Sequence, residues 1–179
     1  MKNKAALNFL AFFGILVFGF LATGCVTKPD TINTSIEEKK HIEEKNLLEF
    51  NHILEGYRNG VLANQINKKL RTQIITFSFA EGNKVYFCTT SDKPMYEQLL
   101  KNPYVSYCTY PENFEPVLSL NGKVNFVEDK VLKERALESN YYAKRNFKSV
   151  DNPLLRVFCI EVEEIETYGT EGPNIYRAK

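Results

Sequence analysis

The chain has 179 residues and a formal net charge of +1, from 23 basic and 22 acidic side chains. A balance this close to neutral lacks the basic surface of a nucleic-acid-binding protein, so we exclude nucleic acid as a partner. The length suits one domain with a sizeable core. Phe and Tyr are abundant and Trp is absent, which fits a small sheet-rich fold.

The N-terminal segment has the pattern of a bacterial lipoprotein signal. Two lysines precede an uncharged, mostly apolar run over 5–22, and Gly24-Cys25 follows it. Basic residues orient such a segment, the apolar run inserts, and a small residue before Cys permits cleavage and lipidation. We predict a signal peptide over 1–24 and lipidation of Cys25. A plain transmembrane anchor is the alternative, although the run is short for a bilayer.

Both interpretations predict a membrane-anchored, extracytoplasmic protein of the cell envelope. Removing 1–24 takes away two lysines and no acid, so the formal charge falls from +1 to −1. Residues 25–34 are polar and include Pro29, which indicates a tether between the lipid and the domain. The domain itself is predicted to occupy 35–179.

A long helix is expected at the start of this domain. Ser35-Ile36-Glu37-Glu38 forms a capping box, and apolar residues follow at near-helical spacings until Gly56. Both histidines of the chain, His41 and His52, fall on this helix, eleven residues apart. A metal-binding pair prefers an i, i+4 spacing, so we assign both histidines to a solvated helix face.

The rest of the chain is rich in strand patterns. We expect strands at 61–65, 70–80 and 84–89, a helix at 95–101, strands at 104–110 and 116–127, helices at 129–140 and 141–147, and one long or two consecutive strands at 154–168. Gly122 interrupts one strand, as at a bulge or barrel corner. Six or seven antiparallel strands with short helices predict a mainly β barrel with helical decoration.

Three cysteines remain after Cys25, namely Cys88, Cys108 and Cys159. Each lies in an apolar, strand-like run, where free Cys commonly behaves as a small buried hydrophobe. Export would permit a disulfide, but the spacing selects no pair. We favour buried thiols over a disulfide or a zinc site.

The loop at 89–93, Thr-Thr-Ser-Asp-Lys, leaves an aromatic strand and opens a helix. Hydroxyls, backbone N–H groups and the Lys93 ammonium can converge there on an anion, which is what a bound phosphate requires. The alternative is an ordinary solvated connection in which Ser91 or Asp92 caps the helix.

Several stretches in a fixed order resemble one known family. They are an aromatic strand ending in Cys-Thr, the loop with Lys93, MYEQLLKNPYVS, a strand carrying NGKV, and EDKVLKERALE. Over about 46–168 the chain resembles the pyridoxamine 5'-phosphate oxidase-like split-barrel family that binds FMN. The resemblance implies a homodimeric split barrel with a flavin in each of two clefts between the subunits.

The resemblance also implies roles for individual residues. Thr89 and Lys93 would contact the FMN phosphate, and Thr90 and Ser91 would be further donors from the same loop. On the strand at 70–80, Arg71 and Gln73 would face the ribityl-phosphate or the edge of the isoalloxazine ring.

At four positions the chain departs from the family pattern. Gln73 stands where a second Arg is frequent, Ile74 where Pro is common, Asp92 where Thr is often found, and Ser119 where many relatives carry Arg. An acid in a phosphate-binding loop is unfavourable unless it points outward or pairs with Lys93.

The resulting hypothesis is a lipid-anchored, FMN-dependent oxidoreductase that acts on an unidentified small molecule. The tail GTEGPNIYRAK lacks the R-x-H-like signature of true oxidases, so we do not assign pyridoxamine 5'-phosphate as the substrate. The acidic cluster at 161–164 is interpreted as a solvated strand edge. The alternative function is a non-catalytic flavin- or phospholigand-binding module, or a cofactor-free structural dimer.

Overall fold

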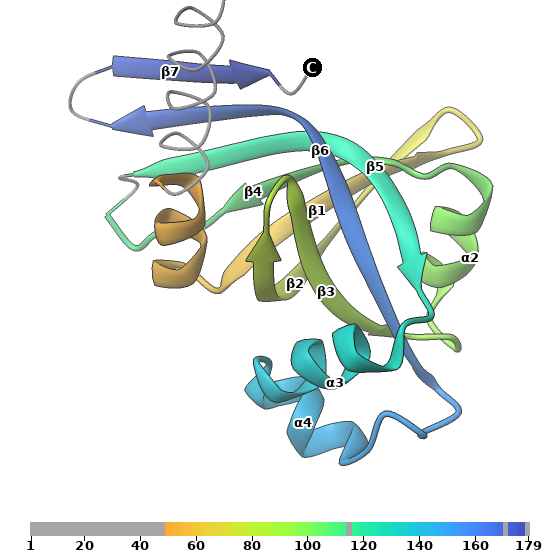
Figure 1. The fold of residues 1–179 in the computed structure, drawn as a ribbon. Coiled ribbons are helices and arrows are strands. Elements are labelled where there is room, and N and C mark those ends of the chain that lie inside the picture. Colours follow the sequence, from red (N-terminus) through yellow and green to blue (C-terminus); the bar gives the residue numbers. More distant parts are fainter. Residues whose placement is uncertain (1–48, 114–115, 170–171, 178–179) are drawn as a thin grey trace, which may run out of the picture.

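The computed structural model describes residues 49–113, 116–169 and 172–177, which form seven strands and four helices (Figure 1). The strands are β1 (Asn59–Ile66), β2 (Lys69–Glu81), β3 (Lys84–Thr90), β4 (Tyr104–Thr109), β5 (Val117–Val127), β6 (Leu155–Gly169) and β7 (Gly172–Arg177). Residues 49–56 are helical, followed by α2 (Pro94–Lys101), α3 (Lys130–Glu138) and α4 (Tyr141–Phe147). The predicted signal peptide, Cys25, the tether and the start of the predicted first helix lie outside the described residues.

Six antiparallel strands close into a barrel. They follow the order β3-β2-β1-β4-β5-β6, and β3 also pairs with β6. The long strand β6 pairs with β5 along one side, and along the other side residues 155–161 pair with β3 and residues 164–169 pair with β7. The predicted antiparallel split barrel with helical decoration is therefore confirmed. The strand β7 was not expected from the sequence.

Aromatic and aliphatic side chains fill the barrel. Along β4, buried residues alternate with exposed or half-buried ones, as in a strand with one face on a core. Leu62, Phe77, Phe87, Tyr107 and Phe158 are completely buried in the main core cluster. Burying side chains of this size stabilises the fold by roughly 1.5–3 kcal/mol each.

A bulge lies where β5 crosses β6, as the interruption at Gly122 predicts. The register shifts between Asn121 and Gly122, and Glu163 is the extra residue on β6. A Cβ on Gly122 would meet the Glu161 carbonyl oxygen and would lie 2.9 Å from Ile160 Cγ2. The acidic side chains here are solvated, but the prediction of a strand edge is wrong, because β6 is paired along both sides.

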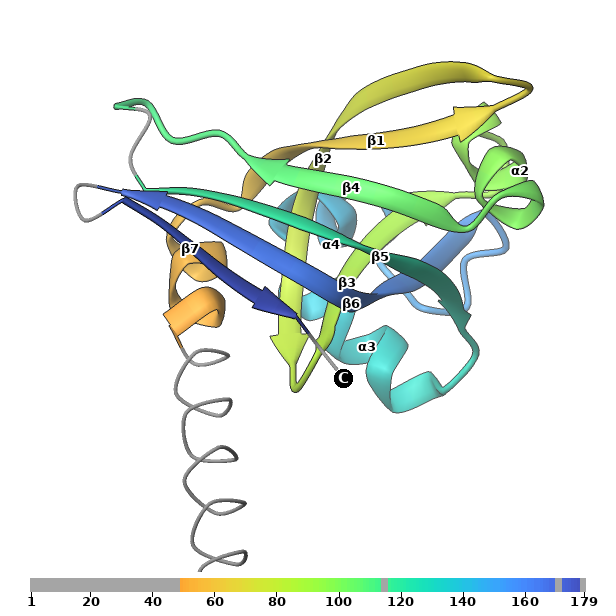
Figure 2. The same cartoon turned by 90° about the horizontal axis from the view of Figure 1, so that it is seen from above.

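The helices pack at separate places on the barrel (Figures 1 and 2). Asn64 Nδ2 donates to Gln98 Oε1 at 3.2 Å, and Asn102 Nδ2 donates to the Gln65 carbonyl at 2.8 Å, which ties α2 to β1. The helices α3 and α4 cover a second apolar cluster that includes Phe79 of β2 and a side chain of β3. The start of α4 lies beside β2, where Asn140 Nδ2 donates to the Thr76 carbonyl.

The cysteines in the described region are all free thiols. Cys159 is buried, whereas Cys88 and Cys108 are half-buried. The expectation of free thiols is thus confirmed, and full burial is confirmed for Cys159 alone. Within the described part of the chain, no helix is both long enough and apolar enough to cross a membrane.

The close approach at the bulge predicts a stability effect. Gly122→Ala should lower the free energy of unfolding by about 1–3 kcal/mol, because the new methyl group collides with the backbone of β6. Gly56→Ala is the control, since a Cβ there meets no atom within 4 Å. Urea denaturation of both variants measures the difference, and equal stabilities would contradict this account of the bulge.

Candidate functional site

A groove runs between the β1–β2 surface and α4, and it contains three adjoining pockets. Their volumes are about 160, 470 and 570 Å³. Thr76 of β2 and Tyr142 of α4 line all three of them. The pockets therefore meet at these two residues and form one continuous site. Each of the two larger pockets lies within the size range of small-molecule and cofactor sites, about 300–1,000 Å³.

The smallest pocket, which we call the phosphate pocket, holds two of the six predicted cofactor residues. Thr89 and Lys93 both line it, with Cys88, Asn140 and Asn146 nearby in the same wall. Thr89 is 2% exposed, and its hydroxyl has no hydrogen-bond partner. A buried orphan hydroxyl costs about 1–3 kcal/mol. Beside the Lys93 ammonium, this hydroxyl is a donor suited to a phosphate oxygen.

We expected backbone N–H groups of the 89–93 loop to bind an anion, but two of them form hydrogen bonds within the protein. The Ser91 N–H donates to the Leu154 carbonyl at 2.9 Å, and the Lys93 N–H donates to the Thr90 carbonyl at 3.3 Å. These two N–H groups are therefore already satisfied inside the protein and are not offered to an anion. The N-cap of α2 is Lys93, without a side-chain cap, so the alternative in which Ser91 or Asp92 caps the helix is wrong.

The other predicted cofactor residues lie outside the three pockets. Thr90 and Ser91 are half-buried in the loop but do not line the groove. Arg71 and Gln73 share one face of β2 with Ile75, because side chains alternate along a strand. The strand β2 lines the groove with Ile74 and Thr76, on the opposite face, and with Ile75, which lines the smallest pocket, whereas Arg71 and Gln73 line none of the three pockets. The structure brings Thr89 and Lys93 together in one pocket, and the other four residues line none of the three pockets.

The departure at Asp92 does not place a negative charge in the phosphate pocket. Asp92 is exposed and is absent from the lining of the groove. Lys93 is also exposed, yet it borders the pocket. Lys93 therefore borders the pocket while Asp92 does not. The repulsion expected between the Asp92 carboxylate and a bound phosphate is reduced.

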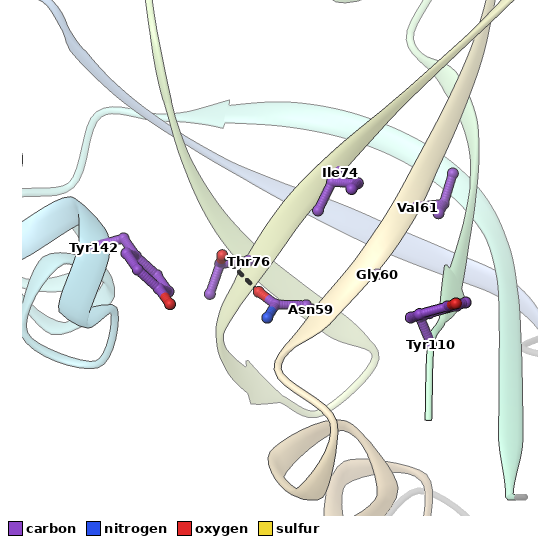
Figure 3. Close-up of a pocket in the computed structure, with 7 residues that line it drawn as sticks. All are labelled: Asn59, Gly60, Val61, Ile74, Thr76, Tyr110 and Tyr142. Atoms are coloured by element: carbon purple, nitrogen blue, oxygen red, sulfur yellow. Dashed lines mark hydrogen bonds between the residues drawn. The ribbon is translucent and has the colours of Figure 1, made fainter. Parts of the chain in front are cut away.

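The second pocket is apolar and has an aromatic side chain at each side (Figure 3). Ile74 and Val61 lie on the strands between Tyr110 and Tyr142. The Thr76 hydroxyl donates to Asn59 Oδ1 at 2.9 Å, which supplies a polar pair at the edge of this pocket. Flat apolar walls with a few polar groups are typical of sites for planar ring systems.

Asn140 holds α4 against β2 and thereby forms the groove. Its side chain is 3% exposed. Asn140 Nδ2 donates to the Thr76 carbonyl at 3.1 Å and to Ser78 Oγ at 3.3 Å, while Oδ1 accepts from the Ala143 N–H at 3.0 Å. The same side chain caps α4 and fixes its position on the strand.

The thiol in the phosphate pocket is not activated. Burial raises the pKa of Cys88 to about 11, and a hydrogen bond with Ser78 offsets only part of this effect. A thiol with this pKa is protonated near neutral pH and is a poor nucleophile. Among the described residues, no group of three or more His, Cys, Asp or Glu side chains could hold a metal ion.

Sequence reasoning missed much of the groove. Thr76, Asn140, Tyr142 and Asn146 were not proposed as site residues, although each lines the phosphate pocket. One available signal was the preference of Asn for the N-cap, which marks Asn140 as the start of a new helix. The approach of α4 to β2 had no signal in the sequence.

Residues 67–169 match the model of a known family, described as Pyridoxamine 5'-phosphate oxidase. The chain belongs to this family. Because the match spans more than half of the chain, the family predicted from the sequence is confirmed. The matched range includes Thr89 and Lys93. No curated protein sequence shows a significant match.

Solved structures share the fold. The General Stress Protein 26 from Bacillus anthracis is 24% identical, covers 77% of this chain and 99% of its own, and has a TM-score of 0.64. A candidate pyridoxamine 5'-phosphate oxidase from Listeria innocua is 28% identical, with coverages of 72% and 99% and a TM-score of 0.60. A FAD-binding protein from Mesorhizobium loti is 16% identical, with coverages of 67% and 91% and a TM-score of 0.57.

The contacts of Asn140 predict a large stability effect. Asn140→Ala should lower the free energy of unfolding by about 2–4 kcal/mol, because it removes a helix cap and leaves buried groups without partners. Asn146→Ala, an exposed residue in the same pocket, should change it by less than about 0.5 kcal/mol. Thermal and urea denaturation measure both values. Similar losses in the two variants would show that Asn140 does not hold α4.

Proposed function

We propose that this protein binds FMN in the groove, with the phosphate at Thr89 and Lys93 and the ring system toward Tyr110 and Tyr142. The observation that carries the proposal is the buried, unpartnered Thr89 hydroxyl in the same pocket as the Lys93 side chain. The phosphate pocket is too small for a whole flavin nucleotide, but it continues into the apolar pocket through Ile74, Thr76 and Tyr142. The FAD-binding neighbour from Mesorhizobium loti supports a flavin as the ligand.

We further propose that the protein is an oxidoreductase acting on a small molecule. A bound flavin supplies electron or hydride transfer, so the protein needs no nucleophile of its own. The protonated Cys88 thiol agrees with this division of roles. The residues of the chain bind the phosphate, orient the ring between two tyrosines and limit access of water to the groove.

Assembly and location extend the proposal. The outer surface of β1, β2 and β4 exposes large apolar side chains, with Leu70 76%, Ile74 80%, Tyr104 59% and Tyr110 67% exposed. A homodimer that buries this surface would remove the patch from water, which supports the pairing implied by the family. We also propose that the lipid on Cys25 anchors the domain at the outer side of a membrane in the cell envelope.

One observation favours a second candidate, a non-catalytic holder of a phosphorylated ligand. Thr89 and Lys93 line one small pocket together, whereas the apolar pocket is bordered by the exposed side chains of Ile74 and Tyr110. Anaerobic addition of NADH or NADPH to the FMN-loaded protein separates the two functions. Bleaching of the flavin favours the oxidoreductase, and a spectrum that is indifferent to both donors favours the holder.

The phosphate assignment predicts the effect of removing the lysine. Lys93→Ala should weaken FMN binding by about 10- to 100-fold, because a charge-assisted contact worth about 1.5–3 kcal/mol is lost. Lys101→Ala is the control, since Lys101 is exposed at the end of the same helix and lines none of the three pockets. Quenching of flavin fluorescence gives the dissociation constants. A folded wild-type protein that cannot be loaded with FMN would refute the proposal.

The variant Thr89→Val also tests the phosphate assignment, through opposite effects on FMN affinity and on the stability of the ligand-free protein. This nearly isosteric change should weaken FMN binding about tenfold, while it raises the free energy of unfolding of the ligand-free protein by about 1 kcal/mol. The gain arises because the orphan hydroxyl disappears. A loss of stability of the same size would mean that the hydroxyl has a partner in the ligand-free protein and is not held ready for a phosphate.

The anchor is tested separately from the flavin. Cys25→Ser should abolish incorporation of labelled palmitate and release the protein from the membrane fraction, because the thiol that carries the lipid is gone. Cys108→Ser is the matched control and should leave both unchanged. Palmitate incorporation that survives in Cys25→Ser would contradict the lipoprotein assignment.

A further inference from the structure

The largest of the three pockets, which we call the arginine pocket, differs in chemistry from the other two. Its volume is about 570 Å³. Arg58 contributes from the residue before β1, Asn59 from the start of β1, Thr76 from β2, and residues 138–142 and Lys144 from the α3–α4 region. The phosphate and apolar pockets account for the two ends of the proposed flavin. The arginine pocket has no role in that assignment.

Among the described residues that line it, the arginine pocket has one more positive than negative charge. Lys144 forms an ion pair with Glu138, so these two charges offset each other. Arg58 Nη1 donates to the Ser139 carbonyl at 2.7 Å, which fixes one side of the guanidinium. Within the described residues, no carboxylate forms an ion pair with Arg58. A guanidinium has five N–H donors in a planar fork, and such a fork suits a carboxylate.

Two tyrosines give the pocket a wall for a flat molecule. Tyr141 and Tyr142 are 68% and 57% exposed, and their ring centroids are 5.6 Å apart in an edge-to-face arrangement. Exposed aromatic rings with polar ends are typical of binding surfaces. Tyr142 also borders the apolar pocket, so this ring lies between the two spaces.

The position of the pocket relates it to the proposed ring of the flavin. Asn59, Thr76 and Tyr142 line both the apolar pocket and the arginine pocket. A molecule in the arginine pocket would therefore lie beside a ring system in the apolar pocket. Electron transfer to or from a flavin requires such a neighbouring position for the reacting molecule.

We infer that the arginine pocket binds the small-molecule substrate, and that this substrate is a planar molecule with a carboxylate that pairs with Arg58. The claim that this molecule is a substrate rests on the proposed flavin function. The claim that it carries a carboxylate rests on the residues of the pocket alone. The net charge of the pocket favours a single negative charge, whereas a phosphate monoester carries about −1.5 to −2 at neutral pH. The phosphate pocket already provides for that group elsewhere in the groove.

Benzoate and its neutral analogue benzamide test the inference on the full chain. By saturation-transfer NMR, benzoate should bind at least about tenfold more tightly than benzamide, because only benzoate forms charge-assisted hydrogen bonds with the guanidinium. Arg58→Gln should remove this preference. Arg58→Lys, which keeps the charge, should retain part of it. Equal binding of the two probes, or an unchanged preference in Arg58→Gln, would overturn the inference.

Two controls separate this result from the flavin proposal. Arg145→Gln removes an exposed arginine of α4 that lines none of the three pockets, and it should leave the preference for benzoate unchanged. Lys93→Ala should lose FMN but keep benzoate, whereas Arg58→Gln should lose benzoate but keep FMN. FMN loading of Arg58→Gln also verifies that this variant is folded.

A further measurement tests whether benzoate binds beside the flavin ring. In the FMN-loaded protein, benzoate should change the visible spectrum of the flavin, because it binds beside the ring. Benzoate that binds without any spectral change would overturn its placement as a substrate. Failure of FMN loading with intact discrimination between the probes would refute the flavin function and leave the carboxylate specificity of the pocket standing.

Discussion

The pairing of β3 with β6 is the constraint on which both the barrel and its site depend. It closes six strands into a barrel and places Thr89 opposite Arg156. The hydrogen bond from the Ser91 N–H to the Leu154 carbonyl continues this connection into the loop. The loop is thereby fixed to the start of β6, and Thr89 is held buried at the pocket. The Ser91 N–H is used for this connection and the Lys93 N–H for a contact within the loop, so the anion site that we propose relies on the side chains of Thr89 and Lys93.

A second constraint builds the opposite wall of the groove. The register between β2 and β3 shifts between Phe77 and Phe79, so that Ser78 is buried next to Cys88 and within reach of Asn140. Asn140 then joins this irregular part of the strand to the first turn of α4. A seven-residue helix is too short to be stable by itself. Its place beside the strand, and with it the position of Tyr142, therefore depends on this buried polar contact.

The sequence predicted which segments form strands and helices better than it predicted which side of each one lines the groove. The apolar, strand-like run VSYCTY made β4 recognisable, and the aromatic run with its polar loop identified β3 and the loop that carries Thr89 and Lys93. At the start of β2, Arg71 to Ile74 are exposed or half-buried on both faces, so alternation gave no sign that Ile74 rather than Gln73 meets the groove. The strand β7 was missed because its segment begins with Gly-Pro, a typical turn signal. The proximity of α4 to β2 arises from tertiary packing alone.

Buried polar atoms without partners do not all indicate ligand sites, and their surroundings decide between them. Among the described residues, these atoms belong to Asn64, Thr89, Thr90 and Tyr107. The Tyr107 ring fills the barrel interior and would collide with a Cβ on Gly60, so its hydroxyl has no space for a ligand. Only Thr89 belongs to the lining of the groove. The buried Thr89 hydroxyl without a partner destabilises the ligand-free protein, and a ligand that accepts a hydrogen bond from it removes this cost. Binding at Thr89 is therefore linked to folding stability. The groove is thus polar and cationic at the phosphate pocket, apolar between the tyrosines, and cationic again at Arg58, which agrees with our proposal of two ligands that meet at Thr76 and Tyr142.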